Sequence, residues 1–308
     1  MIICCGESLI DMISVANAGN ESVYAGLTGG AIFNTSIALG RLDVPVGLIS
    51  GVSTDLFGEK IKKDLTDSNV NIKLLIRNEK PTTLAFVAVK NGQANYTFYD
   101  ENSAGNSIHY SDFPNIPKIA TTLCFGGISL CTEPAASAYE KLFIQEIKNK
   151  VLFLDPNIRS TFISDEISYR KRLNKMISSS DILKVSDEDL DWIVTSGSNI
   201  NEKIEKLHNL GAKLIIVTKG AEGVAAYVKN KKVINLPAQE VNVIDTVGAG
   251  DTFNAGFLAK LSNLKLLSKS NVKNLSSKHI SMALEYGIKA ASITVSRKGA
   301  NPPLLSEI

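Results

Sequence analysis

Residues 243–256 read VIDTVGAGDTFNAG and place glycines and other small residues between an expected strand and an expected helix. Gly248, Ala249 and Gly250 allow the backbone to turn tightly, so successive amide N–H groups can converge on one point just before a helix that begins near Asp251. Converging amides at a helix N-terminus form a binding site for an anion such as phosphate. This stretch therefore predicts a strand–turn–helix unit with an anion site at the turn.

The carboxylate of Asp251 is unexpected at this place, because it would repel a bound phosphate. Two interpretations account for it. Asp251 either takes a proton from the group that attacks the phosphate, as a general base in phosphoryl transfer, or it caps the helix, a position at which Asp is common. The segment alone fits both interpretations.

Short apolar runs alternate with helical stretches along most of the chain, which is the pattern of βαβ units and a mostly parallel sheet. The expected strands are 1–5, 46–51, 122–125, 151–155, 182–185 and 214–218, with a hairpin within 223–236. The expected helices are 31–42, 57–69, 133–150, 187–195, 201–210, 251–261 and 279–292. The basic stretch 265–278 is interpreted as a solvated loop or helix face.

Residues 13–27 and 82–110 break this pattern. They are rich in Thr, Tyr, Phe and Val and alternate polar with apolar residues, which predicts a half-exposed antiparallel sheet beside the main core. Such a sheet is either a lid that closes over a pocket or a surface elaboration without functional motion. The length of 308 residues fits about two domains of ~150 residues each, or one large α/β unit with an elaboration.

The composition excludes several classes of protein. With 33 basic and 31 acidic residues the formal charge is only +2, so no global field steers the chain onto nucleic acid or an anionic membrane. The first ten residues, MIICCGESLI, lack the basic start of a signal peptide. The four cysteines have neither disulfide-scaffold nor metal-site spacing and are interpreted as buried thiols of a reducing compartment. We therefore expect a cytoplasmic protein.

Missing motifs narrow the enzyme classes further. No glycine is followed by lysine, which excludes a P-loop. The GxGxxG pattern of dinucleotide sites fails where it comes nearest, because Phe253 stands in the position of the third glycine. The chain has no GxSxG motif, and His109, His208 and His279 form no clustered ligand set.

Two further groups of polar residues stand where ligands are expected. Asp11 follows the first strand, and a glycine pair with Asn34 opens the next helix. Carboxylates and amides bind sugar hydroxyls well, and glycines let the backbone approach a ligand closely. Asp155, Asn157 and Arg159 directly follow a buried strand, and open α/β sheets bind their ligands at the carboxyl ends of strands.

The sequence resembles the ribokinase-like, or PfkB, family of carbohydrate kinases over essentially its whole length. Residues 245–251 match the family signature DTxGAGD, and residues 29–34 match GGxxxN. Segments 155–159, 184–190 and 296–300 are most similar to bacterial fructokinases. The resemblance implies a three-layer α/β/α core with a mostly parallel sheet, in one domain spanning 1–308, with a small β-sheet lid formed by the insertions 13–27 and 82–110.

The resemblance also implies roles for individual residues. Asp251 would be the catalytic base, and the amides of Gly248, Ala249 and Gly250 would stabilise charge on the transferred γ-phosphate. The residues implied in sugar binding are Asp11, Gly30, Asn34, Tyr96, Phe98, Arg159 and Asp251. Those implied in nucleotide binding are Lys184, Ser186, Thr218, Lys219, Gly220, Gly223, Val247, Gly248, Gly250, Lys289 and Ala290.

The implied cofactors are ATP and Mg²⁺, but one family motif departs from its usual form. The family's NxxE motif reads Ser186-Asp187-Glu188-Asp189 here, so Asp189 or Glu188 would act on Mg²⁺ through water. A monovalent-cation site is implied at Asp245, Val247, Arg297 and Gly299. The resemblance leaves open whether K⁺ is required.

The function that follows is an ATP-dependent sugar kinase that phosphorylates a primary hydroxyl, with fructose converted to fructose 6-phosphate as the first choice. Within the family, 2-keto-3-deoxygluconate, ribose and nucleosides are alternative acceptors. A non-catalytic sugar- or nucleotide-sensing protein is the alternative outside it, although such a protein would not need Asp251 beside a complete anion site. The expected partners are the sugar and ATP, with neither nucleic acid nor membrane, and the exposed lid strands are compatible with a homodimer as well as with a monomer.

Overall fold

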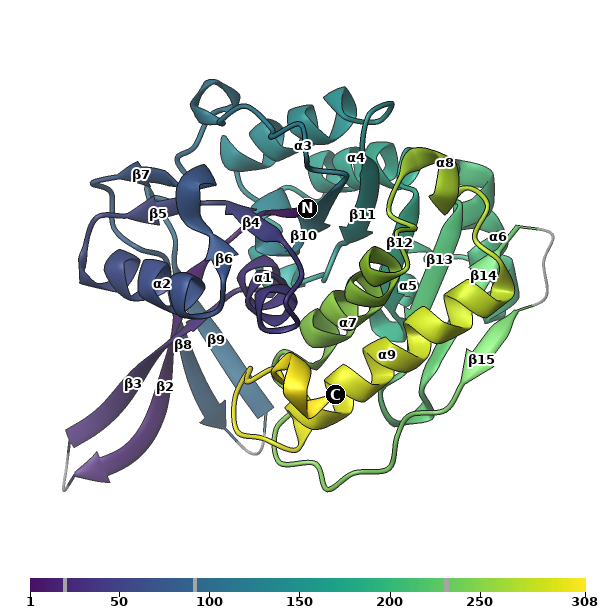
Figure 1. The fold of residues 1–308 in the computed structure, drawn as a ribbon. Helices are drawn as coiled ribbons and strands as arrows, with labels where there is room; N and C mark the ends of the chain where they lie inside the picture. The colour runs from purple at the N-terminus through teal and green to yellow at the C-terminus, as the bar shows by residue number, and fades with distance from the viewer. Residues whose placement is uncertain (19–20, 91–92, 230–232) are drawn as a thin grey trace.

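The computed structural model describes residues 1–18, 21–90, 93–229 and 233–308; the side chains of 15–18, 21–22, 87–90 and 93–96 lie outside this description as well. The strands of the main sheet are β1 (Ile2–Cys5), β4 (Val46–Ile49), β6 (Val70–Asn71), β10 (Thr122–Gly126), β11 (Val151–Asp155), β12 (Ile182–Ser186), β13 (Leu214–Thr218), β14 (Val224–Val228) and β15 (Ile234–Leu236). Within the described residues they form a nine-stranded sheet in the order β15-β14-β13-β12-β11-β10-β1-β4-β6 (Figure 1).

Most neighbouring strands of this sheet are parallel, and only β13–β14 and β14–β15 pair in antiparallel fashion. The central strands are continuous apolar runs that are buried throughout, such as Val151–Asp155. Such runs are typical of parallel strands covered by helices on both faces. The predicted mostly parallel sheet and its terminal hairpin are thus confirmed.

Helices cover both faces of the main sheet and enclose two apolar clusters. On one face lie α1 (Ala31–Arg41), α2 (Leu56–Asp67), α7 (Ala249–Asn263), α8 (Lys269–Val272) and α9 (Ser277–Val295). On the other face lie α3 (Ala135–Gln145), α4 (Glu166–Ile177), α5 (Asp187–Ile193) and α6 (Ile200–Leu210). Cys4 and Cys5 point into opposite clusters, as successive residues of a strand must. The three-layer α/β/α core is therefore confirmed.

Two helices were not predicted from the sequence, and each has a local reason. In α4 the buried face includes Arg172, which pairs there with Glu140 at 3.3 Å, so the apolar periodicity is interrupted by a charge. α8 is a single turn whose start is capped by Ser268, within the stretch interpreted as a solvated loop or helix face. One turn is too short to show a helical repeat.

A separate small sheet consists of β2 (Leu9–Ala18), β3 (Glu21–Gly29), β8 (Leu84–Lys90) and β9 (Gln93–Tyr99), in the order β3-β2-β8-β9. Each hairpin is antiparallel as expected, but the two hairpins join through a parallel pairing of β2 with β8. The first insertion was predicted to start at residue 13, but β2 already begins at residue 9, shortly after β1 ends. The strands of the second insertion end at Tyr99 rather than near residue 110. Figure 1 shows both hairpins extending side by side from the core.

A short two-stranded sheet of β5 (Gly51–Ser53) and β7 (Ile76–Asn78) lies beside α2. Among the described residues, no helix combines the length and apolar character that a membrane span requires.

Candidate active site

A cavity of about 580 Å³ lies at the carboxyl ends of β11, β12 and β13 and at the start of α7. This is the edge at which open parallel sheets bind their ligands. The predicted site residues that line it are Asp11, Gly30, Asn34, Phe98, Arg159, Lys184, Ser186, Glu188, Asp189, Thr218, Gly220, Val247, Gly248, Ala249, Gly250 and Asp251. The structure thus brings together segments that lie far apart in the chain, from residue 11 to residue 251.

Other predicted residues lie away from this lining. Lys219, Asp245, Arg297, Gly299 and Lys289 are not part of the cavity wall. Gly223 is required by packing, since a Cβ there would lie 2.1 Å from the Leu236 carbonyl oxygen. Ala290 of α9 is fully buried against α7. The side chain of Tyr96 lies outside the described residues.

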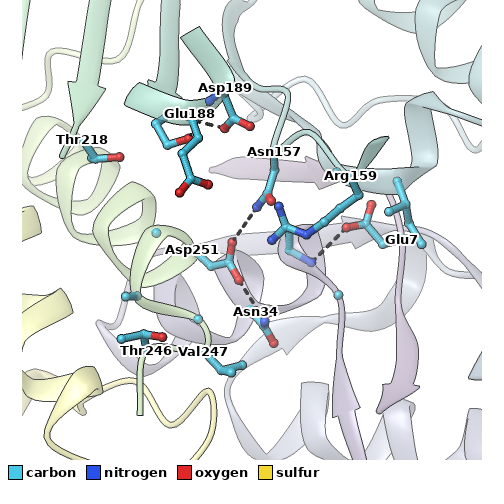
Figure 2. Close-up of a pocket in the computed structure, with 18 of the residues that line it drawn as sticks. Glu7, Asn34, Asn157, Arg159, Glu188, Asp189, Thr218, Thr246, Val247 and Asp251 are labelled. Carbon is cyan, nitrogen blue, oxygen red and sulfur yellow. Dashed lines mark hydrogen bonds between the residues drawn. The ribbon is translucent and has the colours of Figure 1, made fainter. Parts of the chain in front are cut away.

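Asp251 lies in the first turn of α7 and is only 7% exposed. Its Oδ2 accepts a hydrogen bond from Asn34 Nδ2 at 2.9 Å, and its Oδ1 accepts one from Asn157 Nδ2 at 3.5 Å (Figure 2). The helix begins at Ala249, and the Asp251 side chain accepts no capping bond from its backbone. The capping interpretation of Asp251 is therefore wrong, and its carboxylate is held toward the cavity by two amides.

The environment of Asp251 favours a carboxyl that can gain and lose a proton near neutrality. Burial raises the pKa of Asp251 to about 7, and the nearby negative charge of Asp155 acts in the same direction. The hydrogen bond from Asn34 and the positive charges of Lys184 and Arg159 lower the pKa and partly offset that rise. A general base works best when its pKa lies near the working pH.

The turn before α7 has the predicted conformation. Gly248 has a φ of +76°, and a Cβ there would lie 2.7 Å from the Ala300 Cβ, so only glycine fits. The amide of Ala249 donates to the Thr246 carbonyl oxygen at 3.3 Å, whereas within the described residues the amides of Gly248 and Gly250 have no acceptor. Two of the three predicted amides are thus available to an anion.

A buried ion pair lies directly beneath this turn. Lys184 Nζ donates to Asp155 Oδ2 at 3.0 Å, and the two residues are only 4% and 3% exposed. Burial disfavours the charged lysine, but the attraction of Asp155 outweighs it and raises the pKa of Lys184. A Cβ on Gly250 would lie 3.2 Å from Nζ, so the ammonium group stands next to the expected anion position.

Asn254 completes this arrangement by donating from Nδ2 to the same Asp155 oxygen at 2.6 Å. The contact joins α7 to the end of β11, and the salt bridge joins β11 to β12. Asp155 is predicted only as part of a polar segment, and Asn254 is not among the predicted site residues. No signal in the sequence marks Asn254, because its partner lies 99 residues away.

On the opposite side of the cavity, Asp11 faces the glycine pair that opens α1. A Cβ on Gly29 would lie 2.1 Å from Asp11 Oδ2, so this glycine leaves room for the carboxylate. Burial raises the pKa of Asp11 to about 6. Phe98 of β9 packs against Phe162 with ring centroids 3.7 Å apart, so the small sheet contacts the cavity rim.

Glu7 also lines the cavity and was not predicted. Its Oε1 accepts the amide of Ala31 at 2.9 Å and its Oε2 accepts the amide of Ser129 at 3.3 Å. Burial raises the pKa of Glu7. The side chain thus fixes the start of α1, which carries Asn34.

The two residues of the altered NxxE motif that are predicted to act on Mg²⁺ lie in different surroundings. Asp189 is buried, and its Oδ1 and Oδ2 accept the amides of Ile158 at 2.9 Å and Ser186 at 3.3 Å. Glu188 is exposed, and Figure 2 shows its carboxylate on the side of the site where Thr218 and Asp251 lie. Within the described part of the chain, no three His, Cys, Asp or Glu side chains are grouped as metal ligands. Of these two residues, Glu188 therefore has the carboxylate that is available to the cavity, which the exposed Asp187 also lines.

Asp245 links the two segments of the predicted monovalent-cation site. Its Oδ1 accepts the amide of Val247 at 3.1 Å, and its Oδ2 accepts the amide of Gly299 at 2.8 Å. The loop before α7 and the loop after α9 therefore lie side by side.

Comparisons with known proteins show which proteins this chain resembles. A family model described as pfkB family carbohydrate kinase matches residues 1–307. A fructokinase from Rhizobium leguminosarum bv. trifolii is 46% identical over 275 residues, covering 89% of this chain and 84% of that protein. The crystal structure of a Xylella fastidiosa fructokinase with bound ATP has a TM-score of 0.92 at 25% identity, covering 99% of this chain and 96% of that chain. An uncharacterized sugar kinase from Pyrococcus horikoshii in complex with ATP has a TM-score of 0.84 at 26% identity, covering 100% and 97%.

Proposed function

Because this chain belongs to the pfkB family of carbohydrate kinases, we propose that it transfers the γ-phosphoryl group of ATP to the C6 hydroxyl of fructose. The observation that carries the proposal is the buried carboxylate of Asp251, held by Asn34 beside the free amides at the start of α7. A proton acceptor and an anion site lie next to each other there, as transfer of a phosphoryl group to an alcohol requires.

In this reaction the sugar O6 attacks the γ-phosphorus, a new O–P bond forms, and the bond from the γ-phosphorus to the β–γ bridging oxygen breaks. The proton of the hydroxyl passes to the Asp251 carboxylate, and ADP leaves. Charge that develops on the transferred group is stabilised by the amides of Gly248 and Gly250 and by the Lys184 ammonium beneath them. The residues proposed for the hydroxyls of the bound sugar are Asp11, Gly30 and Asn34.

The proposed cofactor is Mg²⁺ bound to the phosphates of ATP. The residues present fit such an ion only loosely, since both Asp189 oxygens accept backbone amides and the carboxylates that the altered motif leaves at the cavity, Asp187 and Glu188, are exposed. Glu188 would hold the ion through water, and the ion would neutralise charge on the phosphates. We further propose that the Asp245 and Gly299 loops hold K⁺, which the hydrogen bond between them supports.

Fructose is proposed as the acceptor because a fructokinase is 46% identical to this chain over most of its length. ATP is proposed as the donor because two structurally similar kinases, at 25% and 26% identity, contain it. The small sheet would act as a lid, since Phe98 reaches the cavity rim from β9. Closing such a lid would exclude water from the phosphoryl group.

The small sheet also supports a proposed homodimer. Val23, Tyr24, Leu27 and Tyr99 are apolar or aromatic and 40% to 62% exposed on its strands. A second copy could cover these side chains and the exposed strand edges. Light scattering coupled to size-exclusion chromatography distinguishes the dimer from a monomer. The four unpaired cysteines and the use of ATP support the cytoplasm as the place of action.

An ATP-consumption assay tests the proposed function, with fructose, ribose, 2-keto-3-deoxygluconate, adenosine and glucose as acceptors, each with and without K⁺. We expect kcat/KM for fructose to exceed that for every other acceptor by at least about tenfold. A faster reaction with another acceptor would contradict the assigned sugar. If no acceptor supports ATP consumption, the alternative of a non-catalytic sensing protein replaces the kinase.

A further inference from the structure

A second cavity, of about 290 Å³, lies at the amino ends of β12 and β13, the edge of the main sheet opposite the active site. Its wall is formed by residues at the start of β13, the end of β14, α8 and the start of α9. Neither of the two sequence signatures nor any predicted site residue contributes to it. The proposed kinase reaction therefore leaves this cavity unused.

One part of the wall is apolar. Leu214 of β13, Val228 of β14, Val272 of α8 and Ile280 of α9 meet there. All of these except Val228 are buried, and Val228 is half-buried. An apolar wall of this size favours a ligand with a small hydrophobic body, because removing that body from water stabilises the complex.

The other part of the wall carries an excess of positive charge around one carboxylate. Asp181 is fully buried, and its Oδ1 pairs with Lys213 at 2.7 Å. Its Oδ2 accepts the amide of Leu152 at 2.9 Å and also pairs with Lys269. Both oxygens of Asp181 are thus occupied, and two lysines already share its single negative charge.

Two more lysines, Lys229 and Lys273, stand at the same cavity. Among the described residues, no acidic side chain lies within ion-pair distance of either. Burial lowers the pKa of Lys269, and repulsion from Lys213 and Lys273 lowers it further, which agrees with ammonium groups crowded together. Lys213 and Lys269 therefore share the single charge of Asp181, and Lys229 and Lys273 add positive charge at the cavity that no described carboxylate balances.

We propose that this cavity is a second ligand site, which binds a small organic anion with its apolar body against Val272 and Ile280 and its phosphate or carboxylate group beside Lys229 and Lys273. The anion would supply the negative charge that Lys229 and Lys273 lack. The apolar wall would distinguish an organic anion from inorganic phosphate.

Phenyl phosphate is a suitable probe, since it joins an apolar ring to a phosphate. Isothermal titration of the intact protein should give a Kd on the order of 1 mM for phenyl phosphate. Inorganic phosphate should bind at least about tenfold more weakly, because it lacks the ring. Saturating ATP should leave the phenyl phosphate Kd unchanged, because the active site lies at the other edge of the sheet.

The matched variants are Lys229→Gln/Lys273→Gln and, as a control, Lys118→Gln/Lys148→Gln, which removes two exposed lysines elsewhere. Lys229 and Lys273 do not pair with Asp181, so the first variant leaves the buried ion pairs intact. We expect it to weaken phenyl phosphate binding about tenfold and the control to leave it unchanged. Equal binding by both variants, displacement by ATP, or no saturable binding to the wild type would overturn the second site.

Discussion

Asn34 Nδ2 donates to Asp251 Oδ2 at 2.9 Å, although the two residues are 217 positions apart in the chain. The bond joins the start of α1 to the start of α7 and so unites the two sequence signatures in one site (Figure 2). It aims the carboxylate of Asp251 into the cavity and stabilises the ionised form. The position of the base is therefore set by contacts between helices.

The pH dependence of the reaction should report this arrangement. Because Asp251 must be ionised to accept a proton, kcat/KM should rise with pH through an apparent pKa of about 7. Asn34→Ala removes a hydrogen bond that lowers the pKa of Asp251, so this rise should move to higher pH. Thr35→Val is the matched control, since the Thr35 hydroxyl donates to the main-chain oxygen of Asp251 and not to its carboxylate. An unchanged profile in Asn34→Ala would contradict the role given to this bond.

Asp155 should have the opposite influence on the base. Its negative charge raises the pKa of Asp251, so Asp155→Asn should move the rise in kcat/KM to lower pH by on the order of half a unit to one unit. Asp181→Asn removes another buried, lysine-paired carboxylate at the far edge of the sheet and serves as control. If the two substitutions only disturb the fold, both variants will have a lower kcat/KM, but its dependence on pH will not move in either.

The burial of Asp251 should cost folding stability at neutral pH. Its pKa is raised from an unfolded value near 3.8 to about 7 in the folded protein, so its contribution to stability is fully present below pH 3.8 and is lost as the pH rises through 7. Asp251→Asn, which mimics the neutral acid, should therefore raise the free energy of unfolding at pH 8 by on the order of 1 to 4 kcal/mol.

Urea unfolding at pH 8 and pH 4 measures this effect, which should be largest at pH 8. Asp165→Asn is the contrasting control, because Asp165 accepts the Ser168 amide, which lowers its pKa. Its replacement should destabilise the protein at pH 8. A loss of stability in Asp251→Asn at pH 8 would show that the ionised carboxylate is well solvated.

Glu188 should influence the metal requirement. Glu188→Gln removes the carboxylate that is proposed to hold the ion through water, so the Mg²⁺ concentration for half-maximal rate should rise about three- to tenfold. Binding of ADP without metal should stay the same, since Glu188 would act only through the ion. Asp191→Asn, on the same helix but paired with Lys203, is the control. Identical Mg²⁺ dependence in wild type and Glu188→Gln would remove Glu188 from the metal's surroundings.

The sequence predicted the main sheet well because its strands are buried on both faces and read as uninterrupted apolar runs. The glycine-rich turn before α7 was also predictable, since Gly248 adopts a conformation open to few other residues. The local sequence does not decide the role of Asp251. An aspartate near the start of a helix fits a helix cap and a general base equally well.

Other features of the site and the fold depend on contacts between distant residues, which no local sequence pattern predicts. Glu7 receives amides from residues 24 and 122 positions away, and Asn254 meets Asp155 across 99 positions. The helix α4 escaped prediction because Arg172 takes a buried place that is normally apolar. In each case the fold brings a polar group to its partner, and only the partner explains the residue.

The most direct test of the kinase assignment compares ATP-dependent formation of fructose 6-phosphate by the wild type and by Asp251→Asn, with ATP affinity measured in parallel. We expect the wild type to form this product, and the variant to lose at least ~10²-fold in kcat while its Kd for ATP stays within a factor of about three. A variant rate within tenfold of wild type, with ATP still bound, would contradict Asp251 as the base.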